Sequence, residues 1–209
     1  MGKDDFIKNI VFGWMESDIK RMVKEIPTED GKIGNINFPL ALYILVCIEY
    51  LGGFLLGKEG DYTSNTKEYI NKCFKTKNEY CTDILRDFFR NGLAHSYGRG
   101  AISRANIRPA IYFKDKNLPL LDVETLASDF LGSLNEFKQQ LNDENYKKRM
   151  DQELQKIKHL KEKHKDKIED LKTKNGSTVE ISSANVSYPN GPFKNTTTIP
   201  YNDEDRKEV

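Results

Sequence analysis

An arginine, an asparagine and a histidine lie close together near the middle of the chain, at Arg90, Asn91 and His95. The guanidinium of Arg90 can hold a phosphate through a planar fork of donors. The imidazole of His95 can move a proton near neutral pH, and the carboxamide of Asn91 can orient either group. These are the groups needed to cleave RNA without a metal, because the 2′-hydroxyl beside the scissile phosphorus is a built-in nucleophile.

The spacing of these residues limits how one helix can use them. Asn91 and His95 are four positions apart and share a helix face, whereas Arg90 and His95 are five apart and point about 140° away from one another. Two arrangements would bring them together. In the first, the helical turn is distorted, either at Gly92 or at a helix end signalled by Gly98. In the second, another copy of the helix lies across a two-fold axis and supplies the missing partner. The second arrangement predicts a composite site at a dimer interface, with His95 as the base or its dimer mate as the acid.

Arginines are concentrated around this motif. The formal net charge of the chain is only +1, yet five of its eight arginines fall between positions 86 and 108, where Asp87 is the only acid. The four arginines besides Arg90 are expected to bind RNA: Arg86, Arg99, Arg104 and Arg108. The alternative is that they are ordinary solvated charges at helix ends and in loops.

The cysteine and histidine content indicates neither a disulfide framework nor a metal site. The three cysteines, Cys47, Cys73 and Cys81, form no CxxC pair, and no His/Asp/Glu cluster has ligand spacing. We therefore expect no metal and no cofactor. The N-terminus lacks the apolar core of a signal peptide, which favours a cytoplasmic setting.

Residues 38–57 are apolar enough to require a membrane check. They hold a single charge, Glu49, near the middle, and a carboxylate there would cost roughly 2.5–3.5 kcal/mol in a bilayer. We favour a buried helix of a soluble bundle over a membrane span, and expect no membrane partner. In such a core Glu49 should have a partner.

Hydrophobic periodicity predicts five helices and one β-hairpin. The helices are expected at 3–26, 38–57, from a cap at Ser64 or Asn65 to about 74, from about 78 to 95, and from 123 to about 141. The hairpin is expected between 107–113 and 118–123, with Pro109 limiting it to an edge position.

The last third of the chain differs in composition. Residues 143–173 are rich in lysines and acids, with apolar residues near heptad positions and Lys161 interrupting the seam. This predicts either a projecting helix that forms a short dimer coil or a charged helix lying on the domain. Residues 174–209 lack enough apolar side chains for a core and are expected to be flexible or partly strand-like. The predicted domain therefore spans 1–142.

The motif Arg90-Asn91-x-x-x-His95 resembles the signature of the HEPN superfamily of all-α domains. That family includes RNase toxins of toxin–antitoxin and abortive-infection systems and the nuclease domains of RNA-guided type VI CRISPR effectors. The surrounding run, FFRNGLAHSYGRGAISR, is similar to HEPN-like proteins of bacteria and their phages. With Tyr97, the motif also resembles toxins whose nucleotidyltransferase antitoxins adenylylate that tyrosine. The alternative role for Tyr97 is packing against the motif helix.

The resemblance implies a mainly α, HEPN-like helical bundle over residues 38–142, with the small hairpin after the motif helix and the charged C-terminal helix as additions. It implies a metal-independent endoribonuclease in a toxin or phage-defence role, with Arg90, Asn91 and His95 as catalytic residues. The implied partners are RNA, a second copy of the chain, and an antitoxin or regulatory protein. Many HEPN domains are catalytically silent, so a nucleotide- or RNA-binding or dimerisation module remains the alternative.

Overall fold

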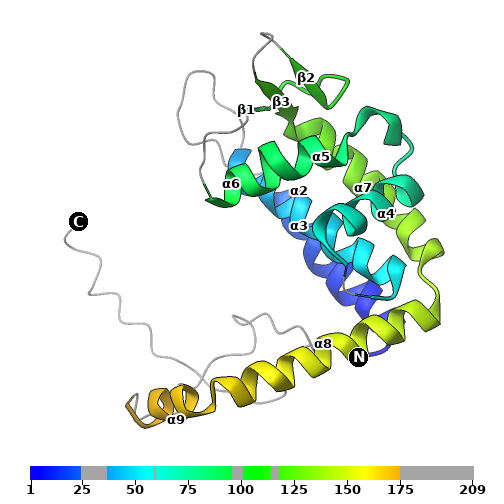
Figure 1. The fold of residues 1–209 in the computed structure, drawn as a ribbon. Helices are drawn as coiled ribbons and strands as arrows, with labels where there is room; N and C mark the ends of the chain where they lie inside the picture. Colours follow the sequence, from blue (N-terminus) through cyan, green and yellow to red (C-terminus); the bar gives the residue numbers. More distant parts are fainter. Residues whose placement is uncertain (25–36, 59, 96–100, 114–117, 175–209) are drawn as a thin grey trace. The chain divides into compact units, whose positions relative to one another are not determined.

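The structure is a computed structural model, and it describes residues 1–24, 37–58, 60–95, 101–113 and 118–174. These residues are mainly helical and include one small three-stranded sheet (Figure 1). The chain divides into two compact units, Gly2–Leu154 and a second unit made of Met1 with Gln155–Val209. The motif and the sheet both belong to the first unit.

The helical segments before the sheet are α1 (Lys3–Asp5), η1 (Phe6–Met15), α2 (Glu16–Lys24), α3 (Asn37–Leu56), α4 (Tyr62–Cys73), η2 (Lys77–Glu79), α5 (Thr82–Ile84), η3 (Leu85–Arg90) and α6 (Asn91–His95). The strands are β1 (Ala101–Ser103), β2 (Ile111–Phe113) and β3 (Pro119–Asp122), and the later helices are α7 (Val123–Gln140), α8 (Asp143–Lys163) and α9 (Lys165–Lys174). Segments η1 and η3 are π-helical, with hydrogen bonds one residue longer than in an α-helix. The predicted first and fourth helices are therefore present, but the fourth begins at Thr82 and not at about 78, where a separate 3₁₀ helix, η2, ends at Glu79. Each of the two helices contains a wide stretch that apolar periodicity did not predict.

Helix α3 is the core helix of the first unit. It is apolar on all sides and packs against α4 and α7. Within the described part of the chain it is the one helix long and apolar enough to cross a membrane, yet 61% of that apolar window is buried inside the fold. This burial agrees with the prediction that residues 38–57 form a buried core helix.

Helix α4 begins earlier than predicted. Its N-cap is Asp61, whose Oδ1 accepts a hydrogen bond from the Ser64 backbone N–H at 2.9 Å. The predicted caps, Ser64 and Asn65, are therefore wrong, and both lie inside the helix. Asn65 is buried where α4 crosses α3 at Gly52.

The sheet has the strand order β1-β3-β2. Strands β2 and β3 form the predicted antiparallel hairpin, with Ile111 opposite Leu121. Pro109 precedes the edge strand β2, as expected. Strand β1 pairs with β3 in parallel and was not predicted, because three residues are too few to show an alternating pattern.

The compact unit continues past the predicted boundary at residue 142. Helix α8 starts at Asp143, and its first turns bury Tyr146 and Arg149. The Asn145 side-chain amide also donates to the Leu55 carbonyl at 2.6 Å. Composition changes at residue 143, but packing continues to Leu154. The predicted tail, 174–209, falls almost entirely outside the described residues.

Candidate active site

The predicted catalytic residues lie where the wide segment η3 passes into α6. Arg90 is the last residue of η3, and the Asn91 backbone N–H bonds to the Arg86 carbonyl five residues back. Phe89 and Leu93 are buried and fix this stretch against the core. From Asn91 to His95 the backbone is α-helical.

The wide segment therefore ends at Arg90, the first residue of the motif, and the rest of the motif is α-helical. A regular turn between Arg90 and His95 keeps the two side chains about 140° apart around the helix axis. Of the two arrangements considered from sequence, a distortion at Gly92 is not present. Gly98 lies outside the described residues. A second copy of the helix therefore stays a prediction, as does a distortion at the helix end near Gly98.

The Arg90 guanidinium has three neighbours from three helices. Its Nη2 lies 3.4 Å from Glu49 Oε2 on α3, and its Nη1 donates to Asn91 Oδ1 at 3.4 Å. Its Cζ sits 5.7 Å from the ring centroid of Tyr62 on α4. The ion pair with Glu49 and the hydrogen bond to Asn91 are both long, so the guanidinium is held loosely. Its buried Nε finds no hydrogen-bond partner among the described residues.

Glu49 and Tyr62 are the site neighbours that the sequence did not assign. The expectation that Glu49 would have a partner is confirmed, and the partner is Arg90. Both charged side chains remain partly open, with 30% of Arg90 and 24% of Glu49 exposed. Tyr62 had no sequence signal. Burial raises the pKa of its phenol well above the usual value, so it is a neutral ring beneath the cation.

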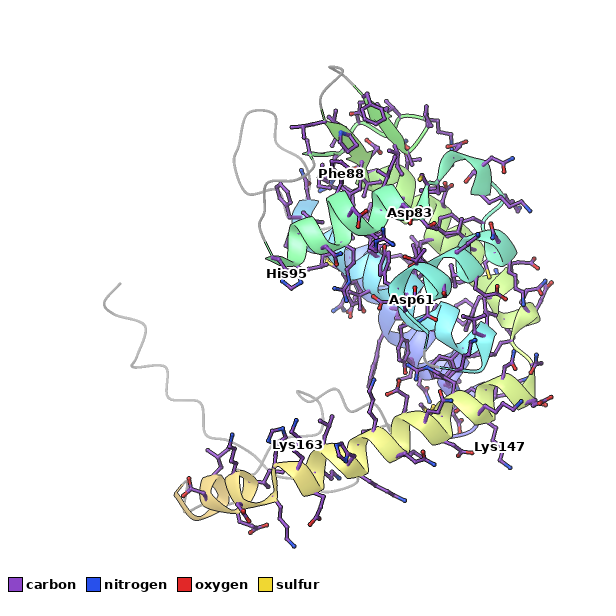
Figure 2. All side chains as sticks on the ribbon, viewed as in Figure 1. Asp61, Asp83, Phe88, His95, Lys147 and Lys163 are labelled. Atoms are coloured by element: carbon purple, nitrogen blue, oxygen red, sulfur yellow. The ribbon has the colours of Figure 1, made fainter. Side chains whose placement is uncertain are left out.

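His95 lies at the end of α6 and is exposed. Figure 2 shows its ring projecting away from the helices, at the margin of the first unit. An exposed imidazole is open to a substrate or to a second copy of the chain. On a regular helix the predicted base, His95, lies about 140° around the axis from the predicted phosphate-binding group, Arg90.

Arg86 lies one helical turn before Arg90 and is bound by neighbouring acids. Its Nε and Nη2 donate to the two carboxylate oxygens of Asp87 at 2.7 and 2.9 Å. Its Nη1 lies 3.3 Å from Asp83 and donates to the Thr63 hydroxyl at 2.6 Å. The positive charge of Arg86 is therefore largely compensated.

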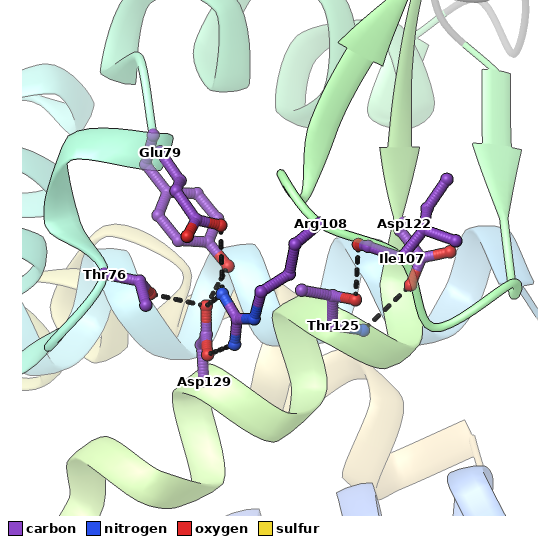
Figure 3. A network of polar contacts seen from close by, with 8 residues as sticks. Thr76, Glu79, Ile107, Arg108, Asp122, Thr125 and Asp129 are labelled. Atoms are coloured by element: carbon purple, nitrogen blue, oxygen red, sulfur yellow. Dashed lines mark hydrogen bonds and ion pairs between the residues drawn. The ribbon is translucent and has the colours of Figure 1, made fainter.

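Arg104 and Arg108 connect elements of the fold. Arg104 is only 3% exposed and binds Glu124 Oε1 and the Val23 carbonyl, each at 3.0 Å. Arg108 bonds Asp129 at 2.5 Å and Glu79 at 2.9 Å (Figure 3). Together with Arg86, these side chains are engaged by acids, so the cluster of arginines in the sequence does not make an open cationic patch in the described residues.

Two of the predicted site residues, Tyr97 and Arg99, lie outside the described residues. Among the residues that are described, no group of three or more His, Cys, Asp or Glu side chains is arranged to hold a metal ion. Comparison of the chain with protein-family models, with curated proteins and with solved structures gave no match.

Proposed function

We propose that the chain is a HEPN-like, metal-independent endoribonuclease that works at a composite dimer site in a toxin or phage-defence role. The observation that carries the proposal is the partly exposed Arg90 guanidinium, held beside Asn91 on the same helical stretch that ends in the exposed His95. The mainly helical fold around this stretch is compatible with that family. The same proposal places the protein in the cytoplasm, with an antitoxin or regulatory protein as a further partner.

The proposed reaction needs one proton acceptor, one proton donor and one cation. The His95 imidazole of one copy takes the proton of the ribose 2′-hydroxyl, whose oxygen attacks the neighbouring phosphorus. The bond to the 5′-oxygen breaks, and the same imidazole, now protonated, gives its proton to that leaving oxygen. Arg90 binds the phosphoryl oxygens and stabilises the added negative charge. The products are a 2′,3′-cyclic phosphate and a 5′-hydroxyl.

An exposed apolar side chain next to the motif supports a dimer. Val46 lies on α3 three positions before Glu49 and is 43% exposed. Ala94 on α6 is exposed as well. Apolar side chains beside a polar site suit a subunit contact, because burying them favours association.

The test is cleavage of RNA by the purified chain in the presence of a chelator. We expect cyclic phosphate ends, no cleavage of DNA, and a loss of at least about 100-fold in rate for His95→Ala. His159→Ala is the matched control, because His159 is also exposed but lies on α8. Cleavage that survives His95→Ala, or that requires a metal, would contradict the proposal.

The second candidate is a catalytically silent HEPN-like module, and one observation favours it. Glu49 already occupies one side of the Arg90 guanidinium and would repel an incoming phosphate. In that case Arg90 and His95 stabilise a dimer or bind a nucleotide without cutting. Retained RNA or nucleotide binding by a folded protein that cleaves nothing would select this candidate.

A further inference from the structure

The second unit presents a helix whose apolar side chains face solvent. The backbone hydrogen bonds of α8 continue into α9, with the His164 N–H bonding to the Leu160 carbonyl at 3.1 Å and the Ile168 N–H to the His164 carbonyl at 2.9 Å. Figure 2 shows side chains projecting on all sides of this helix around the labelled Lys163. Four large apolar residues of this unit are 36–58% exposed: Ile157, Leu160, Ile168 and Leu171.

These four residues form one narrow stripe. At about 100° per residue they fall within an arc of about 80° around the helix axis. We call this set the apolar stripe. His164 is the one polar side chain within the same arc. Since charged side chains dominate the rest of the helix, the stripe gives the helix two distinct faces.

The charges are sorted around the apolar stripe by sign. On the same wheel three lysines lie within about 80° of each edge of the stripe, namely Lys158, Lys161 and Lys165 on one side and Lys156, Lys163 and Lys167 on the other. The acids occupy the opposite face, centred about 170° from the centre of the stripe, and they are Glu162, Asp166, Glu169 and Asp170. A lysine on such an edge can lay its apolar stem along the stripe and direct its ammonium outward.

This order disfavours a second copy of the helix as the occupant of the stripe. When two such helices pair through their stripes, the edges of one face the edges of the other, in parallel and in antiparallel orientation alike. Lysines would then face lysines on both sides of the seam. A nucleic acid would be attracted by the lysines but would leave the apolar stripe unused.

We propose that residues 155–171 form an amphipathic helix that lies on an anionic lipid bilayer, with the apolar stripe in the headgroup region and the flanking lysines on the lipid phosphates. A helix that is polar on average, with apolar and basic faces adjoining, binds membranes in this way. The acids then point to water. Such a helix rests on the surface and does not span the bilayer, so α3 can remain buried in the core.

The experiment is flotation of the full-length chain with vesicles of phosphatidylcholine alone and with vesicles in which part of the lipid is phosphatidylglycerol. We expect binding to the anionic vesicles only, weakened by salt. Ile157→Glu should weaken binding at least about tenfold, because it places a charge in the stripe. Gln155→Glu makes the same charge change among the acids on the opposite face and should change binding less than about twofold. Lys158→Gln and Lys167→Gln should each weaken binding about fivefold, the factor for about 1 kcal/mol per charge.

Circular dichroism of each variant shows whether the helix is kept. Leu160→Gln is a second test of the apolar stripe, because glutamine is polar but still favours a helix. Equal binding to neutral vesicles, binding to neither kind, or equal damage by Gln155→Glu and Ile157→Glu would each overturn the proposal. If the chain forms an oligomer in the absence of lipid and Ile157→Glu dissociates it, the apolar stripe is assigned to a second copy of the chain. If the chain does not bind vesicles, and if it binds RNA but loses that binding in the lysine variants, the helix is assigned to nucleic acid.

Discussion

At the scale of single residues, Arg90 is held by a carboxylate that would compete with the proposed phosphate for the same guanidinium. Glu49 lies 3.4 Å from Arg90 Nη2 and repels an anion arriving there. We expect Glu49→Gln to lower the KM for RNA by up to about fivefold, the range for a partly exposed ion pair. We also expect kcat to fall, because Glu49 restrains the rotamer of Arg90. Steady-state cleavage of a short RNA measures both constants.

Glu68→Gln is the matched control for this change. It removes the carboxylate that pairs with Lys72 on α4, at 2.7 Å, and leaves the Arg90 cluster intact. Its KM and kcat should equal those of the wild type. If Glu49→Gln also leaves both constants unchanged, Arg90 does not meet the phosphate and the catalytic role assigned to it fails.

Asp129 should make stability depend on pH. It accepts hydrogen bonds from Arg108 at 2.5 Å, Tyr80 at 2.6 Å and Thr76 at 2.7 Å (Figure 3). Burial acts to raise the pKa of this carboxyl, but the hydrogen bonds outweigh burial and lower it below its usual value. A lowered pKa in the folded state stabilises the fold above the unfolded-state pKa of about 4 and loses that contribution as the pH falls through the folded-state pKa.

We therefore expect Asp129→Asn to lower the free energy of unfolding near neutral pH by about 1–2 kcal/mol. The difference from the wild type should shrink as the pH falls below about 4. Urea unfolding across this pH range measures it, with Asp166→Asn on the exposed α9 as the control. A difference that stays constant with pH would show that the ionised carboxylate is not the source of the effect.

Sequence reasoning reached some of these residue contacts and not others. A single charge in an apolar run was enough to predict that Glu49 needs a partner. The acids that engage Arg104 and Arg108, by contrast, lie 20 and 21 positions along the chain, in α7. A count of charges between positions 86 and 108 misses these acids, because they lie outside that window. Only the folded structure brings them into contact with the two arginines.

At the scale of elements, the crossing of α3 and α4 depends on the absence of a side chain at Gly52. A Cβ built there would lie 1.9 Å from the Asn65 carbonyl oxygen. Because that neighbour is backbone, the helices must separate to admit a methyl group. We expect Gly52→Ala to lower the free energy of unfolding by about 3 kcal/mol or more, measured by chemical denaturation.

Gly132→Ala gives the opposite expectation in the same measurement. Gly132 lies within α7, and a Cβ there would meet nothing within 4 Å. Alanine should therefore stabilise the protein by up to about 1 kcal/mol through helix propensity. Equal effects of the two substitutions would mean that the close approach of α3 and α4 does not limit the fold.

The elements that could be predicted are those with long apolar patterns. Helices α3 and α7 and the β2–β3 hairpin fall close to their predicted positions. The π-helical segments η1 and η3 could not be predicted, because their apolar residues still recur at the three- and four-residue steps typical of an ordinary α-helix. The start of α4 was missed because several residues near it can cap a helix, and tertiary packing decides among them.

At the scale of the whole molecule, composition and packing place the domain boundary differently. Lysines and acids dominate from residue 143 onward, which predicted a separate charged helix. In the structure the compact unit extends to Leu154. Phe54 accounts for this difference, because its ring stacks with that of Tyr146, with centroids 5.8 Å apart, and lies beneath the guanidinium of Arg149. A few buried contacts thus anchor the start of a helix whose average composition suits solvent.

The assembly of the proposed site can be tested by mixing two inactive variants. Because the α-helical turn keeps Arg90 and His95 about 140° apart, a complete site would take Arg90 from one copy and His95 from the other. Arg90→Ala and His95→Ala should each be inactive alone. After subunit exchange their mixture should regain about a quarter of wild-type activity, since half of the dimers are mixed and one of two sites in each is intact.

A further substitution in both variants tests the dimer contact. With Val46→Glu added, the mixture should stay inactive and run as a monomer. With Leu118→Glu added, at another exposed apolar residue, activity should still recover. A mixture that exchanges subunits and stays inactive would show that the two side chains do not meet across a dimer.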